Sequence, residues 1–151
     1  MAKKKKQKNI PISALGGSSS KEVRKADNVP ENFDTFTPSW QFHLLDCEGP
    51  FGWNNVSPDF IWNIFSNRIK DKEHINWSQL KTSGSHNVSL DQLSKEALRR
   101  LKEIKQDDLD ELFSLRLSGK ERIWGIRDRY TLKVLWWDPE HAVCPSHKKH
   151  T

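Results

Sequence analysis

The sequence predicts a small α+β domain in which a C-terminal three-stranded antiparallel meander packs on two main helices, behind a disordered basic tail. Length is the first observation, because 151 residues are typical of one domain with one core. The second is a change of hydrophobic period, from helical spacing over Leu90–Ile104 to strand-like segments after residue 111. The third is that only short turns separate these segments, which indicates an antiparallel arrangement.

Charge divides the chain into a basic tail and a nearly neutral body. Residues 1–25 hold eight basic groups and one acidic group, whereas the remaining 126 residues hold 17 basic and 19 acidic groups. Lysines, glycines and serines cannot bury enough apolar surface to offset the entropy of ordering. We therefore expect a disordered tail over residues 1–37, a single α+β domain over residues 38–145 and a flexible end over residues 146–151. The tail is either an electrostatic arm for RNA or the ribosome, or a solubilising segment.

The composition predicts a reduced, cytoplasmic chain that does not contact a membrane. No apolar run approaches the roughly 20 residues that cross a bilayer, and the Lys-rich N-terminus lacks the apolar centre of a secretory signal. The two cysteines, Cys47 and Cys144, lie far apart in the sequence, as is common in reduced proteins. Seven Trp and seven Phe residues predict a core built from a few large side chains.

The first half of the predicted domain contains one strand and the start of a helix. Apolar and polar residues alternate over Ser39–Leu45, which predicts a half-buried strand. Ser57, followed by Pro58 and Asp59, has the pattern of a helix start. One apolar face of this helix is predicted at Ile61, Ile64, Phe65 and Ile69. Residues 71–88 are polar and predict a connection with turns, after which Ser89 is expected to cap the second helix.

Three segments near the C-terminus predict the meander: Leu112–Leu117, Arg122–Arg127 and Tyr130–Trp137. Alternation places the middle-strand residues on two faces, with Arg122, Trp124 and Ile126 on one and Ile123, Gly125 and Arg127 on the other. Trp136 and Trp137 also face opposite ways, so one can lie in the core while the other is exposed as a partner anchor or a platform for base stacking. A place in the core or at an interface is favoured over base stacking.

Basic side chains are concentrated in the meander and are candidates for binding phosphate. The segment Leu112–Trp137 contains only two acids among its charged residues and six basic residues: Arg116, Lys120, Arg122, Arg127, Arg129 and Lys133. Arginine suits phosphate because its planar fork donates two parallel hydrogen bonds. The alternative is ordinary ion pairing at the sheet edge with Glu111, Glu121, Asp128 or Asp138.

Residues 90–145 follow a pattern of helix, acidic connection, arginine-bearing hairpin and hydrophobic strand. The hairpin has the sequence Leu-Ser-Gly-Lys-Glu-Arg-Ile-Trp-Gly-Ile-Arg over residues 117–127, and the last strand has Leu-Lys-Val-Leu-Trp-Trp-Asp-Pro-Glu-His over residues 132–141. This pattern resembles that of the RelE/YoeB-type toxins, which are compact α+β ribonucleases that cleave mRNA, usually in the ribosomal A site. The resemblance implies a RelE-like fold, mRNA or the ribosome as a partner, and an antitoxin protein that covers the basic sheet face. The chain departs from the family in its added N-terminal third and in the absence of the usual terminal Tyr.

The resemblance also assigns roles to individual residues. In these toxins a ribose 2′-hydroxyl attacks the adjacent phosphate without a metal ion. Arg116 and Arg122 match the hairpin arginines and are expected to stabilise the phosphate, while His141 matches the C-terminal proton-transfer position. Glu111 is the candidate for a second proton-transfer group. RNA binding is expected from Lys120, Arg127, Arg129, Lys133 and Trp137. The alternative for His141 is a hydrogen-bonded surface residue that follows a turn at Asp138-Pro139.

Other chemistries find less support in the sequence. His141, Cys144, His147 and His150 are spaced by three and carry atoms that zinc accepts, but ligands on a short terminal segment rarely enclose an ion. No metal and no cofactor are therefore predicted. A Gly-rich phosphate loop is missing, so a nucleotide cofactor is not expected. Two further functions stay open: a non-catalytic RNA- or protein-binding module with the same fold, and a protein-interaction subunit that uses the acidic stretch Asp107–Glu111.

Overall fold

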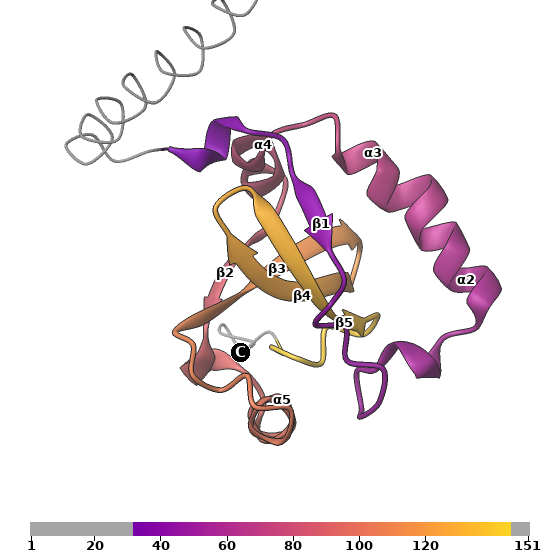
Figure 1. The fold of residues 1–151 in the computed structure, drawn as a ribbon, viewed down its shortest axis with the longest axis vertical. Helices are drawn as coiled ribbons and strands as arrows, with labels where there is room; N and C mark the ends of the chain where they lie inside the picture. Colours follow the sequence, from indigo (N-terminus) through magenta and orange to yellow (C-terminus); the bar gives the residue numbers. More distant parts are fainter. Residues whose placement is uncertain (1–31, 146–151) are drawn as a thin grey trace, which may run out of the picture. The chain divides into compact units, whose positions relative to one another are not determined.

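Five strands form one mixed sheet in the order β1-β5-β4-β3-β2, in a computed structural model that describes residues 32–145 (Figure 1). β1 runs parallel to β5, and the other neighbours are antiparallel. The strands are β1 (Ser39–Gln41), β2 (His86–Ser89), β3 (Glu111–Ser118), β4 (Glu121–Asp128) and β5 (Thr131–Asp138). The α+β class and the C-terminal meander are confirmed. Residues 1–31 of the tail predicted over residues 1–37 lie outside the described residues, as does the end predicted over residues 146–151.

A long helix, a short helix and a helix on the opposite face complete the domain (Figure 1). The long helix, residues 58–72, joins α2 (Pro58–Asn63), a π-helical stretch (Ile64–Ile69) and α3 (Lys70–Lys72). The other helices are α4 (Trp77–Thr82) and α5 (Lys95–Glu103), and 3₁₀ turns occur at Phe33–Thr35, Trp53–Asn55 and Leu90–Gln92. Within the described part of the chain, none of the helices is both long and apolar enough to pass through a membrane.

The helix starts follow local capping chemistry. Ser57 caps the long helix as predicted, because its hydroxyl accepts a hydrogen bond from the Phe60 N–H. Ser89 does not cap the second helix: it ends β2 and precedes the 3₁₀ turn Leu90–Gln92, and its hydroxyl donates to Asp91. The cap of α5 is Ser94, whose hydroxyl accepts from the Ala97 N–H at 3.1 Å. The second helix therefore begins five residues later than predicted.

Two strands differ from the prediction. β1 ends at Gln41, and the chain then turns, since the Leu45 N–H bonds to the Phe42 carbonyl. β2 forms within the segment predicted as a polar connection, where Val88 supplies its only buried side chain. Pairing with β3 satisfies the hydrogen-bonding groups of the β2 backbone. This short polar strand therefore depends on a neighbour that lies more than twenty residues further along the chain.

Each face of the sheet carries its own hydrophobic core. The α4 face lies under the long helix and α4, and its core includes Ile64, Ile69, Trp77, Leu80, Phe113, Leu115 and Ile123. The α5 face lies under α5, and its core includes Val88, Ala97, Leu101, Leu112, Trp124 and Trp136. The alternation predicted for β4 is thus confirmed, with Ile123 on the α4 face and Trp124 on the α5 face.

Trp136 and Trp137 both lie in the cores, on opposite faces of β5. Neither is exposed, because helices and loops cover both faces of the sheet at this point, so the favoured place in the core holds for both. A bulge at Leu135 sets their register, since Trp124 faces Trp136 while Gly125 faces Val134.

The domain begins before the predicted boundary at residue 38. The turn Phe33–Thr35 is fixed to the sheet by Asp34, which accepts hydrogen bonds from Arg127 at 2.6 Å and from Lys81 at 3.0 Å. Burial raises the pKa of Asp34, but these two cations outweigh that effect and hold the pKa below its ordinary value.

Candidate nucleic-acid interface

Arg116 in β3 and Arg122 in β4 lie directly opposite each other across the two antiparallel strands. Facing residues of antiparallel strands project to the same side of the sheet, so both guanidinium groups belong to the α5 face with Trp124. Two like charges in this position repel each other. The arrangement is therefore one that a bound anion would stabilise.

The carboxylates near this pair are engaged elsewhere. Glu121 pairs with Arg68, and Asp138, which faces Arg122 across the strands, accepts hydrogen bonds from Trp124, Ala142 and Val143. Within residues 32–145, neither Arg116 nor Arg122 forms an ion pair. The ordinary ion pairing that the sequence left open for these two arginines is thus not observed there.

The Arg122 guanidinium is held in place, but its buried Nε has no hydrogen-bond partner in the described structure. Its Nη1 donates to the carbonyls of Gly119 at 2.7 Å and Glu121 at 3.0 Å. Burial lowers the pKa of Arg122, and the charge of Arg116 lowers it further, against the opposing effect of Asp138. An anion oxygen near Nε would satisfy the donor and reduce the repulsion.

Lys72, at the end of α3, adds a third cation that the sequence analysis did not single out. Burial lowers the pKa of Lys72, and the charges of Arg68 and Arg116 lower it as well, while Asp71 opposes them. Arg116 therefore acts electrostatically on both Arg122 and Lys72. We call Lys72, Arg116 and Arg122 the cationic cluster.

The start of β2 positions the Arg116 side chain. The backbone N–H of Arg116 donates to the buried Ser85 hydroxyl at 2.9 Å. Gly84 has a φ of +115°, and a Cβ atom there would lie 2.8 Å from the Arg116 Cδ. The backbone conformation at residue 84 thus favours glycine, and a larger residue there would also displace the Arg116 side chain.

Asp138 organises the loop that carries His141. Its buried carboxylate accepts hydrogen bonds from the Trp124 indole at 3.1 Å and from the backbone N–H groups of Ala142 and Val143 at 2.8 and 2.9 Å. The loop thereby folds over the α5 face, where Val143 joins the core. His141 adopts a φ of +60° in this loop, a conformation that non-glycine residues seldom occupy.

Three buried polar atoms have no hydrogen-bond partner in the described part of the chain: the Ser114 Oγ, the Arg122 Nε and the His141 Nδ1. Ser114 faces Trp124 across the strands, and Arg122 faces Asp138. All three atoms therefore belong to the α5 face or to the loop folded over it. Buried polar groups are normally paired, so this face has unused capacity for a polar ligand.

His141 and His86 line the same hollow, which has a volume of about 740 Å³. His86 is the first residue of β2 and faces Ser114, and its Nδ1 lies 3.3 Å from the Gly84 carbonyl oxygen. Asp91, Lys95 and Cys144 also line the hollow, which gives it a polar wall. Two imidazoles are therefore present at the same end of the α5 face as the unpaired polar atoms.

Glu111, the predicted second proton-transfer group, is not part of this arrangement. It begins β3, opposite Ser89, and Arg116 lies five residues further along the strand. At about 3.4 Å per residue, the two Cα atoms are roughly 17 Å apart.

The structure places the predicted RNA-binding residues at several separate positions. Lys120 is exposed in the β3–β4 turn and pairs with Glu140, while Arg129 is exposed in the β4–β5 turn. Lys133 is half-buried beside Asp128. Arg127 is bound to Asp34 and lies over the Trp77 ring, and Trp137 is packed between Trp53 and Phe60 in the core. Arg127 and Trp137 thus serve the fold, and neither offers a free surface for RNA.

Sequence reasoning missed Lys72, His86 and Ser114. Lys72 is the last residue of a helix with an apolar face and resembles a solvated position in the sequence, because only tertiary packing brings it near Arg116. His86 was placed in a polar connection, since the four-residue strand β2 has one buried apolar side chain. Ser114 is a polar residue inside a buried strand, and that mismatch is the one signal that could have indicated it.

Comparison with protein-family models, with curated proteins and with solved structures finds no match to this chain. Within residues 32–145, no group of three or more His, Cys, Asp or Glu side chains is arranged to hold a metal ion. His147 and His150 of the spaced ligand set lie outside the described residues. The properties of the site therefore rest on the geometry of the cationic cluster and the loop of His141.

Proposed function

We propose that the chain is a metal-independent endoribonuclease that cleaves RNA by 2′-hydroxyl attack on the adjacent phosphate, in the manner of the RelE/YoeB-type toxins that its C-terminal half resembles. The observation that supports this most is the facing pair of Arg116 and Arg122. The two guanidinium groups lack ion-pair partners in the described chain, and the buried Arg122 Nε is unpaired. A phosphate bound between them would supply the missing acceptor and neutralise like charges.

The chemistry that this reaction requires can be supplied by Arg116 and Arg122 on the α5 face, by His141 in the loop folded over that face, and by Lys72 at the end of the long helix. A base removes the 2′-hydroxyl proton, the 2′-oxygen bonds to phosphorus, and the bond from phosphorus to the 5′-oxygen breaks. An acid then protonates the 5′-oxygen, which yields a 2′,3′-cyclic phosphate and a 5′-hydroxyl end. In the proposal, Arg116, Arg122 and Lys72 stabilise the charge that develops on the phosphate oxygens, and His141 transfers a proton.

His86 is better placed than Glu111 to be the second proton-transfer group. It lines the same hollow as His141, whereas Glu111 lies at the far end of β3. Removal of one group that stabilises the charge developing in the transition state typically lowers the rate by about 10²–10³-fold. Removal of one proton-transfer group typically lowers it by about 10²–10⁴-fold.

Growth and RNA integrity test this proposal in a bacterial host. The wild-type chain is induced beside Arg116→Ala, His141→Ala and the control Arg99→Ala, which changes an exposed arginine on α5. We expect growth arrest and new RNA 5′-hydroxyl ends with the wild type and the control, and neither effect with Arg116→Ala or His141→Ala. Normal growth and intact RNA in the presence of soluble, folded wild-type protein would contradict the proposal.

A further inference from the structure

Three aromatic side chains cluster where the β4–β5 turn meets the first described turn of the chain, and we call Phe33, Phe36 and Tyr130 the aromatic platform. Phe36 and Tyr130 stack, with their ring centroids 5.4 Å apart and an angle of 14° between the ring planes. The Phe33 ring is tilted against both. None of the three has a role in the proposed reaction.

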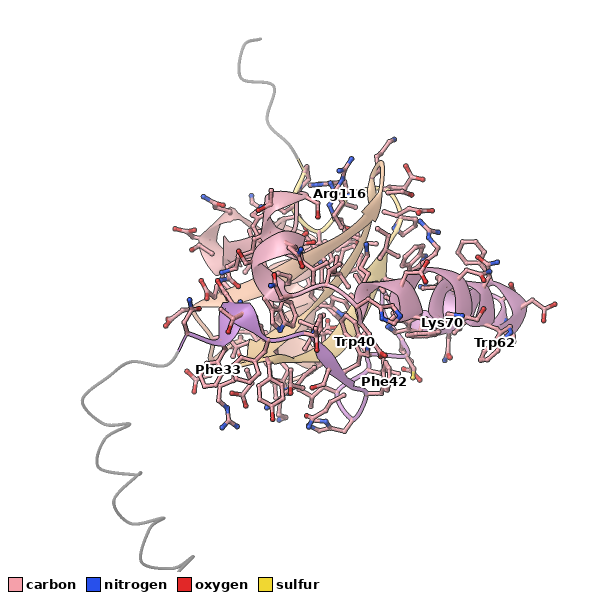
Figure 2. All side chains as sticks on the ribbon, turned by 90° about the horizontal axis from the view of Figure 1, so that it is seen from above. Phe33, Trp40, Phe42, Trp62, Lys70 and Arg116 are labelled. Carbon is pink, nitrogen blue, oxygen red and sulfur yellow. The ribbon has the colours of Figure 1, made fainter. Side chains whose placement is uncertain are left out.

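The aromatic platform is distant from the cationic cluster. Figure 2 shows Phe33, at the start of the described chain, well apart from Arg116. Arg122 is the second residue of β4, and Asp128, the last residue of that strand, lies six residues further along. At about 3.4 Å per residue, roughly 20 Å separates Arg122 from the β4–β5 turn. The platform is therefore a separate place on the domain.

The two stacked rings are exposed although they are large and apolar. Phe36 is 41% exposed and Tyr130 is 42% exposed. Single apolar side chains are common on protein surfaces, whereas stacked rings present a joint aromatic surface to the solvent. Every nucleobase has a flat π-face, and proteins bind unpaired bases without regard to sequence by stacking them on such rings.

Backbone hydrogen bonds fix the platform before any ligand binds. The Tyr130 carbonyl accepts from the Ser39 N–H and from the Trp77 indole, both at 3.0 Å. The Phe36 carbonyl accepts from the Trp77 N–H at 3.1 Å, and the Phe36 N–H donates to the Phe33 carbonyl at 3.2 Å. Because these main-chain groups are already paired, a peptide strand cannot add to them. A ligand is recognised here through rings and charges.

Positive charge is in excess around the platform, within the described domain itself. Four cations share two carboxylates: the acids are Asp34 and Asp128, and the cations are Lys81, Arg127, Arg129 and Lys133. Arg127 is turned toward the Trp77 ring and serves the fold. Arg129 precedes Tyr130 in the chain and is the most exposed of the four, with 66% of its side chain accessible. It is therefore the cation most available to a phosphate.

Rings and charge together select one class of ligand. A second copy of the chain would bring a second excess of cations to the same surface, which is repulsive. A nucleic-acid duplex or an acidic peptide offers negative charge, but the bases of a duplex are already stacked on each other and an acidic side chain has no flat face. An unpaired strand carries a flat base and a phosphate at every step, so it matches both features of the platform.

We propose that the aromatic platform binds single-stranded nucleic acid. An unpaired base stacks on the Phe36–Tyr130 pair, and Arg129 contacts a neighbouring phosphate. The site is separate from the proposed reaction, because no platform residue belongs to the cationic cluster. It binds a strand whether or not that strand is cleaved.

The single tyrosine of the chain makes the platform directly observable. Tyr130 is the one tyrosine in the sequence, so labelling tyrosine rings with ¹³C gives one set of NMR signals that needs no assignment. The probes are a twelve-nucleotide DNA strand and a 2′-O-methyl RNA strand of the same sequence, neither of which carries the 2′-hydroxyl that cleavage requires. An abasic strand of equal length keeps the phosphates and removes the bases.

We expect the base-bearing strands to move the Tyr130 signals upfield, because a stacked base adds its ring current, and a shift with either sugar supports the platform. The abasic strand should give no such shift. It should also bind at least about fivefold more weakly, as measured by fluorescence anisotropy of labelled strands. This comparison uses the wild-type full chain and does not depend on any variant.

Variants separate stacking from charge. Tyr130→Ala is expected to weaken the base-bearing strands at least about fivefold and to leave the abasic strand unchanged, while Tyr130→Trp should keep wild-type affinity because an indole also stacks. Arg129→Gln should weaken both kinds of strand to a similar degree. Matched controls are Trp62→Ala, an exposed aromatic on α2, and Arg99→Gln, an exposed arginine on α5, both of which should bind as the wild type does.

Four results would overturn the inference. The first is equal affinity for base-bearing and abasic strands, and the second is unshifted Tyr130 signals at saturating strand. The third is binding of a duplex or of a poly-glutamate peptide of equal charge as tight as that of the single strand. The fourth is a concentration-dependent dimer, measured by light scattering, that Tyr130→Ala abolishes. RNA cleavage without a Tyr130 shift would leave the proposed ribonuclease standing alone, and a shift without cleavage would leave the platform standing alone.

Discussion

Arg127 lies at the centre of the contacts that hold the N-terminal turn on the sheet. Its guanidinium donates to Asp34 at 2.6 Å and to the Arg129 carbonyl at 2.8 Å, and its Cζ lies 4.4 Å from the centre of the Trp77 ring. A mostly buried cation over an aromatic face stabilises a protein by up to about 2 kcal/mol. The strand pattern could place Arg127 on a face, but the sequence held no sign that Trp77 and Asp34 would meet it there.

Arg127→Ala is predicted to act on stability rather than on RNA binding. We expect the free energy of unfolding, measured with urea, to fall by about 2 kcal/mol because the cation–π contact and the Asp34 pair are lost. RNA affinity should stay within twofold of the wild type. A large loss of RNA affinity at unchanged stability would show that Arg127 faces the nucleic acid.

Asp138→Asn is predicted to loosen the loop of His141. The neutral amide accepts the hydrogen bonds from Trp124, Ala142 and Val143 less strongly than the carboxylate does, and its NH₂ group cannot accept from them. Since hydrogen bonds to charged groups contribute about 1.5–3 kcal/mol, we expect a stability loss in that range. Hydrogen exchange at Ala142 and Val143 should accelerate in the variant. Unchanged exchange at both amides would contradict the role given to Asp138.

At the scale of elements, the sequence predicts that serines cap the helices, but it does not always identify which serine is the cap. Ser57 and Ser94 both cap helices, yet Ser89 satisfied the same sequence pattern five residues earlier. The segment after Ser89 forms a 3₁₀ turn because Leu90 donates its N–H to the Asp110 carbonyl, outside any helix. That contact is tertiary, so no local pattern reveals it.

Ser94→Ala and Ser89→Ala separate the true cap from the apparent one. Loss of the Ser94 cap is expected to lower the free energy of unfolding by about 1 kcal/mol, whereas Ser89→Ala should change it by less than about half of that. Urea unfolding of both variants measures the difference. Equal effects of the two substitutions would contradict the observed start of α5.

The π-helical stretch Ile64–Ile69 is a second element that periodicity could not distinguish from an ordinary helix. The predicted apolar face is present, with Ile64 and Ile69 both buried, but these residues are five apart. The N–H of Lys70 bonds to the carbonyl of Phe65, which is the wider π spacing. Phe65 thereby lines the groove between β1 and the long helix, while Arg68 reaches Glu121 at the β3–β4 hairpin.

At the scale of the whole molecule, the two cores explain which sequence inferences could succeed. β4 and β5 are rich in apolar, β-branched and aromatic residues because both faces of the sheet are covered, so the meander could be predicted from the sequence. β2 could not be predicted in this way, because it depends on pairing with β3. The cationic cluster could not be predicted either, because Lys72 approaches Arg116 only through packing of the long helix. Arg116 and Arg122 could be chosen as candidates from the hairpin, although their direct opposition depends on the register.

Acid is predicted to destabilise the whole domain through carboxylates that are paired in the fold. Burial raises the pKa of Asp46, but hydrogen bonds from Arg100 and Trp136 outweigh that effect and hold it below its ordinary value of 3.8. Arg68 lowers the pKa of Glu121 from its ordinary value of 4.5. Groups with lowered pKa values stabilise the fold above their ordinary pKa, and this contribution is lost as the pH falls through the folded value.

Urea unfolding between pH 7 and pH 2 measures this dependence. We expect the free energy of unfolding to be steady above about pH 5 and to decrease steeply below about pH 4. In Asp46→Asn the domain should be less stable at pH 7, with a smaller decrease in acid, because one titrating group is gone. A variant that keeps the wild-type slope below pH 4 would show that Asp46 is not among the groups responsible.

The central claim is that the cationic cluster binds the RNA backbone, and the salt dependence of RNA binding tests it most directly. The affinity of the full chain for a short single-stranded RNA is measured against salt concentration for the wild type, Arg122→Gln, Lys72→Gln and the control Arg99→Gln. Each phosphate contact that is lost should reduce the slope of log affinity against log salt by about 0.7, so both cluster variants should show a smaller slope and the control should not. Slopes that are the same in all four proteins would contradict the claim.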